Sequence, residues 1–99
     1  MGSVFHSIDN QTGYELLTAP ADIRIIRLTL CNVETSDTTV NVNLFKNLAT
    51  GQTARITGYN TAIDGGEMLT LTDLILSTGQ FLTITTDGAI DVDINYITI

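Results

Sequence analysis

Val40-Asn41-Val42-Asn43-Leu44 alternates strictly between apolar and polar residues. Successive side chains of a β-strand point to opposite faces, so this stretch predicts a strand with one buried and one exposed face. Residues 90–96 and 24–30 alternate in the same way. In the second of these stretches the pair Ile25-Ile26 interrupts the alternation, and a β-bulge at this pair would restore it.

Turn-forming residues separate the alternating stretches. Asp64-Gly65-Gly66 predicts a turn, and Asp87-Gly88 stands between two strands at the spacing of a two-residue hairpin. No segment carries a sustained helical stripe of apolar residues. The pattern predicts about eight strands, near residues 3–8, 14–18, 23–33, 38–46, 53–59, 67–76, 80–86 and 90–98.

Eight short strands in 99 residues favour a single all-β domain over residues 1–99, a jelly-roll-like Greek-key β-sandwich. Residues 1–12 are predicted as an N-terminal arm. The residues predicted to be buried in the core are Val40, Val42, Leu44, Leu69, Leu71, Leu82, Ile84, Val92 and Ile94.

The charge composition of the chain limits the kinds of molecule that it is expected to bind. The formal net charge is −7, and the only basic residues other than one histidine are Arg24, Arg27, Lys46 and Arg55. Nucleic-acid binders need a basic surface to neutralise phosphates, so we expect neither nucleic acid nor an anionic membrane as a partner. Cys31 is the single cysteine, which excludes an intrachain disulfide. No secretory leader and no membrane-length apolar run is visible, so we expect synthesis in the cytoplasm.

Residue patterns for catalysis and metal binding are weak. His6 is the only histidine, and no Gly-x-Ser-x-Gly nucleophile motif is present, so we expect no enzyme, no catalytic residue and no cofactor. The segment from Asp91 to Asn95 matches the opening of a calcium loop, but Tyr96 stands where that loop requires glycine. The alternation there predicts a strand instead, and we expect no metal site.

Several apolar residues fall on the outward side of their predicted strands. Phe45 is out of phase with the buried positions of its strand, and Ile97 and Ile99 share the face of the acidic residues of the last strand. A second bulge near Tyr96 is the alternative that would turn both isoleucines inward. Together with the apolar residues of the N-terminal arm, they form the candidate interface: Val4, Phe5, Ile8, Phe45, Ile97 and Ile99.

The order of these elements resembles a pattern of small structural proteins of tailed bacteriophages. The matching elements are Thr18-Ala19-Pro20-Ala21, a strand that ends at Asn32, the turn Ser36-Asp37 and the Thr/Val-rich strand after it, followed by Gly-x-x-Leu-x-Leu at residues 66–71 and Gly-x-x-Leu-x-Ile at residues 79–84. The resemblance covers most of residues 17–99. It implies a decoration or cement protein of the virion, often trimeric, and a turn-forming structural role for Asn32.

The expected function is therefore a structural virion protein that binds and stabilises the phage head shell as a homotrimer. Its partner would be the major capsid protein or another shell protein. A tail, neck or baseplate protein is one alternative. A carbohydrate-binding jelly-roll module is another, with Tyr14 and Tyr59 as aromatic platforms, although the chain has no tryptophan and only 6% aromatic residues. An enzyme with an unrecognised site is the third.

Overall fold

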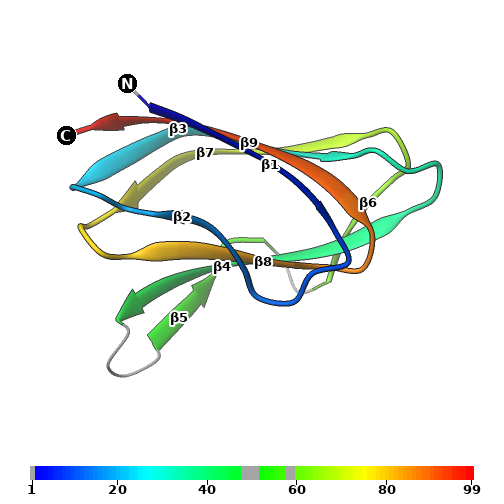
Figure 1. The fold of residues 1–99 in the computed structure, drawn as a ribbon, viewed down its shortest axis with the longest axis horizontal. Helices are drawn as coiled ribbons and strands as arrows, with labels where there is room; N and C mark the ends of the chain where they lie inside the picture. The colour runs from blue at the N-terminus through cyan, green and yellow to red at the C-terminus, as the bar shows by residue number, and fades with distance from the viewer. Residues whose placement is uncertain (1, 48–51, 58–59) are drawn as a thin grey trace.

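The computed structural model describes residues 2–47, 52–57 and 60–99, and in this part it contains two antiparallel sheets and no helix (Figure 1). The four-stranded sheet has the order β1 (Gly2–Asp9), β9 (Ala89–Thr98), β3 (Ile23–Asn32) and β7 (Met68–Leu76). The five-stranded sheet has the order β2 (Tyr14–Thr18), β8 (Phe81–Thr86), β4 (Thr38–Asn47) and β5 (Gln52–Arg55), and β6 (Thr61–Ile63) also pairs with β4. This all-β arrangement is consistent with the predicted β-sandwich. The described residues include no helix that could span a membrane.

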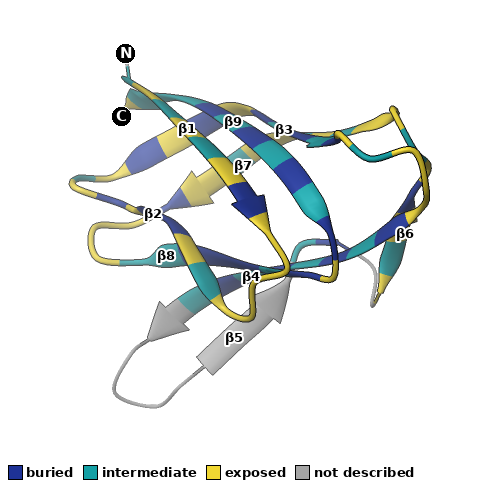
Figure 2. Cartoon of the chain, turned by 45° about the vertical axis from the view of Figure 1, so that its right-hand side comes forward, coloured by how far each residue is buried: buried dark blue, intermediate teal, exposed yellow. Residues whose placement is uncertain are grey.

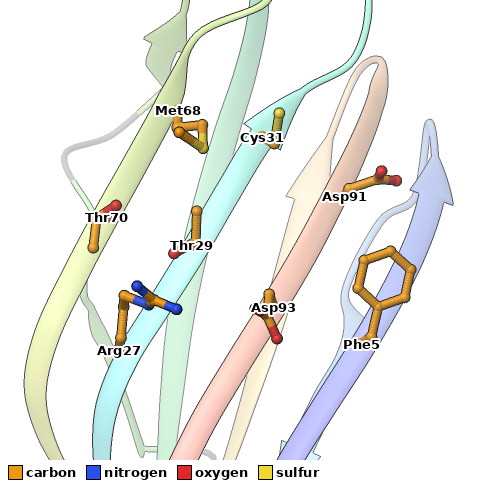
Figure 3. Close-up of a pocket in the computed structure, with 8 residues that line it drawn as sticks. All are labelled: Phe5, Arg27, Thr29, Cys31, Met68, Thr70, Asp91 and Asp93. Atoms are coloured by element: carbon orange, nitrogen blue, oxygen red, sulfur yellow. The ribbon is translucent and has the colours of Figure 1, made fainter.

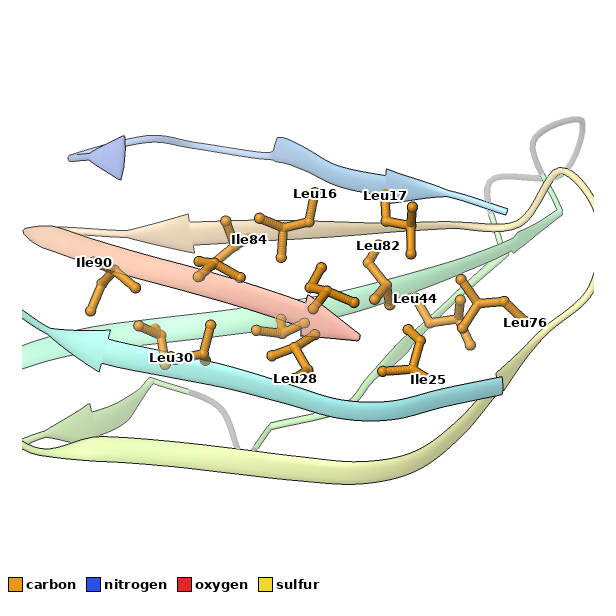
Figure 4. Packing of buried hydrophobic residues seen from close by; sticks show 14 of the residues in the cluster. Leu16, Leu17, Ile25, Leu28, Leu30, Leu44, Leu76, Leu82, Ile84 and Ile90 are labelled. Carbon is orange, nitrogen blue, oxygen red and sulfur yellow. The ribbon is translucent and has the colours of Figure 1, made fainter. Parts of the chain in front are cut away.

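Apolar side chains from both sheets meet in one core (Figure 4). Val40 and Val42 are fully buried and Leu44 is 9% exposed, as the alternation of the opening stretch predicts. The same prediction is confirmed for Leu82, Ile84, Val92 and Ile94. It is wrong for Leu69 and Leu71, which are only partly buried. Both lie on β7, an edge strand of its sheet, where only one neighbouring strand helps to cover a side chain.

The predicted bulge in β3 is confirmed. The pairing of β3 with β9 shifts by one residue between Ile25 and Arg27. Ile25 has no exposed surface, whereas Ile26 is 36% exposed. The extra residue therefore keeps both halves of β3 in phase with the core.

The predicted hairpin at Asp87-Gly88 is wrong. β8 pairs with β2 and β4, whereas β9 pairs with β1 and β3, so the two consecutive strands lie in different sheets. Gly88 also lacks the positive φ that the second residue of a type I′ turn requires. A Cβ at Gly88 would lie 2.6 Å from the Thr38 hydroxyl oxygen. Glycine is needed here because the backbone passes close to Thr38 where the chain crosses between the sheets.

The predicted strand at residues 53–59 is also wrong in part. Two separate short strands, β5 and β6, pair with different portions of β4. β5 pairs with residues 43–47 of β4, and β6 pairs with residues 38–40. Of the residues between them, Ile56 donates a backbone hydrogen bond to the carbonyl of Val42, which keeps the chain beside β4.

Asn32 has a structural role of the kind that the resemblance implies. Its side chain is fully buried. The Nδ2 amide donates to the backbone carbonyls of Ser36 and Ile63, both at 2.8 Å. Its Oδ1 atom accepts from the backbone amide of Glu34 at 3.0 Å and from the Thr38 hydroxyl at 3.4 Å. One amide thereby joins the β3–β4 turn to β6 of the opposite sheet.

Asp22 ties the loop before β3 to the loop before β8. Its Oδ1 atom accepts from the backbone amide of Thr78 at 2.9 Å and from the Thr78 hydroxyl at 3.1 Å. These two hydrogen bonds, the backbone one first, hold the pKa of Asp22 below the ordinary value of 3.8.

This lowered pKa predicts a pH dependence of stability. The unfolded chain binds the Asp22 proton more readily than the folded chain, so the contribution of Asp22 is present at neutral pH. It is lost as the pH falls from about 5 through the lowered pKa. In thermal melts across this window, Asp22→Asn should show a shallower fall in Tm than the wild type. Asp37→Asn is the control, because Asp37 is exposed and its carboxylate accepts no hydrogen bond from the described residues. Equal slopes for all three proteins would contradict the assignment.

Candidate functional site

The outer face of the four-stranded sheet brings together residues from the beginning, middle and end of the chain. The antiparallel register places Phe5 beside Asp93, Asp93 beside Thr29, and Thr29 beside Thr70. These four residues form one row across β1, β9, β3 and β7. Because side chains alternate along each strand, the rows two residues away point to the same side.

A hollow of about 360 Å3 lies over these rows (Figure 3). Its eight lining side chains project from the same side of the sheet, away from the core. The lining residues are Phe5, Arg27, Thr29, Cys31, Met68, Thr70, Asp91 and Asp93. Phe5 and Met68, at opposite edges of the sheet, are 63% and 66% exposed. We call this feature the hollow.

The hollow carries charges of both signs. Asp91 accepts a hydrogen bond from the Ser7 hydroxyl at 2.8 Å. Arg27 and Asp93 make no side-chain hydrogen bond or ion pair with any residue that the structure describes. The hollow presents unused hydrogen-bonding groups next to an exposed aromatic ring.

A second feature of this face is a group of isoleucines around Arg24, whose side chain is 48% exposed, at the other end of the sheet. Ile97 and Ile75 are both placed opposite Arg24 of β3, one on each side of it. Ile75 and Ile99 are each 61% exposed, and Ile97 is half-buried. We call Ile75, Ile97 and Ile99 the isoleucine patch. The pairing of β9 with β1 runs without a shift up to Tyr96, and the extra residue at the shift between β3 and β9 belongs to β3. The alternative of a second bulge near Tyr96 that turns Ile97 and Ile99 inward is therefore wrong.

The predicted N-terminal arm is a strand of the chain's own sheet. β1 pairs with β9 along residues 2–9, which places Val4 opposite Ile94 and Ile8 opposite Ile90. Burial varies from residue to residue along β1 (Figure 2). Ile8 is 7% exposed and Val4 packs against the core, so these two residues face inward. Of the three candidate interface residues on β1, Phe5 alone faces solvent. An arm that reaches a neighbouring subunit would first have to give up the pairing with β9.

Phe45, the remaining member of the predicted interface, belongs to the other sheet. It lies on β4 opposite Phe81 of β8, and the two rings stack with centroids 4.7 Å apart and an angle of 2° between their planes. Both residues are half-buried. Each ring covers part of the other, and both residues are less exposed than Ile75 and Ile99.

His6 and Tyr14 form a structural contact between the edges of the two sheets. The carbonyl of Leu16 can only accept a hydrogen bond, so His6 Nε2 donates to it at 2.7 Å. His6 Nδ1 then accepts from the Tyr14 hydroxyl at 3.3 Å, and the rings meet edge to face. Tyr14 is thus occupied by this contact, and Tyr59, the other predicted sugar platform, lies outside the described residues.

The acidic residues of β9 lie on an extended strand, as the sequence predicts. Asp91 and Asp93 pair with Cys31 and Thr29 of β3 in regular register. The described ranges contain no group of three or more His, Cys, Asp or Glu side chains that could hold a metal ion.

No model of a known protein family matches the chain, and no curated protein shows a significant match to its sequence. The assignment of these surfaces therefore depends on their geometry. The sequence identified the isoleucine patch through Ile97 and Ile99, but not the hollow. Alternation shows which residues of a strand face outward, whereas the hollow depends on which strands become neighbours.

Proposed function

We propose that this chain is a structural virion protein that decorates a phage head shell as a homotrimer. The observation that carries the proposal is the isoleucine patch, since exposed apolar side chains that cluster on one face favour a protein–protein contact. The resemblance of residues 17–99 to phage structural proteins supports the virion context. Self-association would also multiply weak contacts with a shell, because binding of one subunit raises the effective concentration of the others.

The strand order supports a jelly-roll topology as the finer description of the fold. If β5 and β6 are counted as one interrupted strand, the described residues form eight strands in two sheets of four. The sheets then have the orders first–eighth–third–sixth and second–seventh–fourth–fifth. Jelly rolls are eight-stranded double sheets built from Greek keys, and they occur in viral capsid proteins.

Light scattering coupled to size exclusion tests the trimer. We expect a mass three times the 10.7 kDa of the chain. The double variant Ile75→Ser, Ile99→Ser should elute as a monomer with an unchanged circular dichroism spectrum, because both side chains are exposed. Val33→Ser is the matched control, since Val33 is 52% exposed outside the isoleucine patch. A monomeric wild type, or a double variant that remains trimeric, would contradict the role of the patch.

Immunogold labelling of purified virions tests the location. Gold particles over the head are the expected result. Gold over the tail, neck or baseplate would show that the chain is a structural protein of that part of the virion and does not decorate the head. Intact virions without any label, when the same antibody labels the purified chain, would contradict a virion role.

A further inference from the structure

We infer that the hollow on the four-stranded sheet is a binding site for a neutral carbohydrate, a function that does not depend on the proposed role in the virion. The inference starts from its volume of about 360 Å3. That volume is at the lower end of the range for small-molecule sites. It suits one end of a sugar chain, and the open outer face leaves room for the rest.

The charges of the hollow disfavour a ligand that carries charge of only one sign. Asp91 and Asp93 would attract a cation, but Arg27 lines the same hollow and would repel it. An anion would be attracted by the single arginine but repelled by the two carboxylates. A sugar hydroxyl resolves it, because the same group donates to a carboxylate and accepts from a guanidinium. Thr29 and Thr70 add hydroxyls that can also do both.

The arrangement of these groups suits the two kinds of surface on a sugar ring. Phe5 lies next to Asp93 in the register, so a ring resting on the exposed phenyl face has the carboxylate at its rim. Arg27 lies one strand further, in the neighbouring row of outward side chains. Aromatic rings supply a rigid apolar platform, while the planar guanidinium offers several donors in fixed directions. The apolar face and the hydroxyl edge of one sugar are thereby contacted together.

We would titrate the wild-type chain with simple sugars and monitor its amide NMR signals, which tests the sugar-binding inference directly. The probes are the methyl glycosides of glucose, galactose, mannose and N-acetylglucosamine at millimolar concentrations. At least one probe should shift the amide signals of Phe5, Thr29, Thr70 and Asp93. The signals of the isoleucine patch should not move. If none of the four glycosides shifts the hollow signals, the inference is wrong.

Three single variants identify the chemistry of the ligand. Phe5→Leu keeps an apolar side chain but removes the ring, and it should weaken sugar binding about tenfold or more. Arg27→Gln and Asp93→Asn should each weaken it too, because a neutral ligand uses both groups. Thr98→Ala changes an exposed residue that lines neither the hollow nor the isoleucine patch, so it is the control and should bind like the wild type.

Charged probes distinguish the competing ligand classes. Spermidine represents a cationic ligand and sulfate an anionic one. A cation would bind more tightly to Arg27→Gln, and an anion would bind more tightly to Asp93→Asn, since each change removes a repulsive charge. Either of these results, with sugars bound more weakly than the charged probe, would overturn the inference. Trimer formation and virion labelling are separate measurements, so failure here leaves their outcome unaffected.

Discussion

Ile94→Ala should lower the free energy of unfolding by about 2–5 kcal/mol. Ile94 has no exposed surface, and on β9 it pairs with Val4 on one side and Leu28 on the other. Truncation removes buried apolar contacts and leaves a cavity that its two paired neighbours prevent from collapsing. Urea denaturation should show a lower midpoint with an unchanged slope, because a pure loss of stability does not alter the surface exposed on unfolding.

Leu71→Ala is the matched control for this prediction. The sequence alone predicts full burial of Leu71 and hence an equally large loss, but the structure leaves Leu71 partly exposed on the edge strand β7. We therefore expect a clearly smaller decrease in the unfolding free energy than for Ile94→Ala. Equal losses for the two variants would mean that β7 is covered in solution, for example by another copy of the chain.

Asn32→Asp should be comparably destabilising although it changes no side-chain volume. The Nδ2 amide donates to two backbone carbonyls, and a carboxylate oxygen in its place would face both of them without a proton. An uncompensated buried charge costs about 3–5 kcal/mol at neutral pH. Chemical denaturation at pH 7 measures this loss. The control is Asn41→Asp, the same change at a partly exposed residue that bonds to the exposed Asn60.

The loss of unfolding free energy caused by Asn32→Asp should also depend on pH. Burial raises the pKa of the introduced carboxyl above its value in the unfolded chain. The folded state then binds more protons than the unfolded state, so the variant regains stability as the pH falls through this raised pKa. A loss that is small at pH 7, or that does not diminish on acidification, would contradict the hydrogen-bonding role of Asn32.

The sequence predicts which side chains are buried better than it predicts which strands lie side by side in a sheet. The alternation around Val42 and Ile94 identifies core residues because the side-chain period is a property of the single strand. The bulge at Ile25-Ile26 is predictable for the same reason, since the broken alternation is visible in the sequence. The partial exposure of Leu71 is not, because it depends on the position of β7 at the edge of a sheet.

The errors have a common physical origin. Asp87-Gly88 has the composition of a hairpin turn, but its glycine serves a close approach to Thr38 between two sheets. The hollow was missed because Phe5 and Asp93 become neighbours only through the pairing of β1 with β9. Both depend on contacts between segments far apart in the chain, which local composition does not encode.

The pairing of β1 with β9 also sets the order of events during synthesis. Among the described strands, β1 is synthesised before all the others, and its one partner in the sheet order, β9, is synthesised after them. β3, the next strand along that sheet, likewise receives β9 as its neighbour only at the end. The four-stranded sheet therefore cannot be completed on the ribosome until β9 has left the exit tunnel. Contacts this distant in sequence slow folding, and a nascent chain that waits with open strand edges is exposed to aggregation.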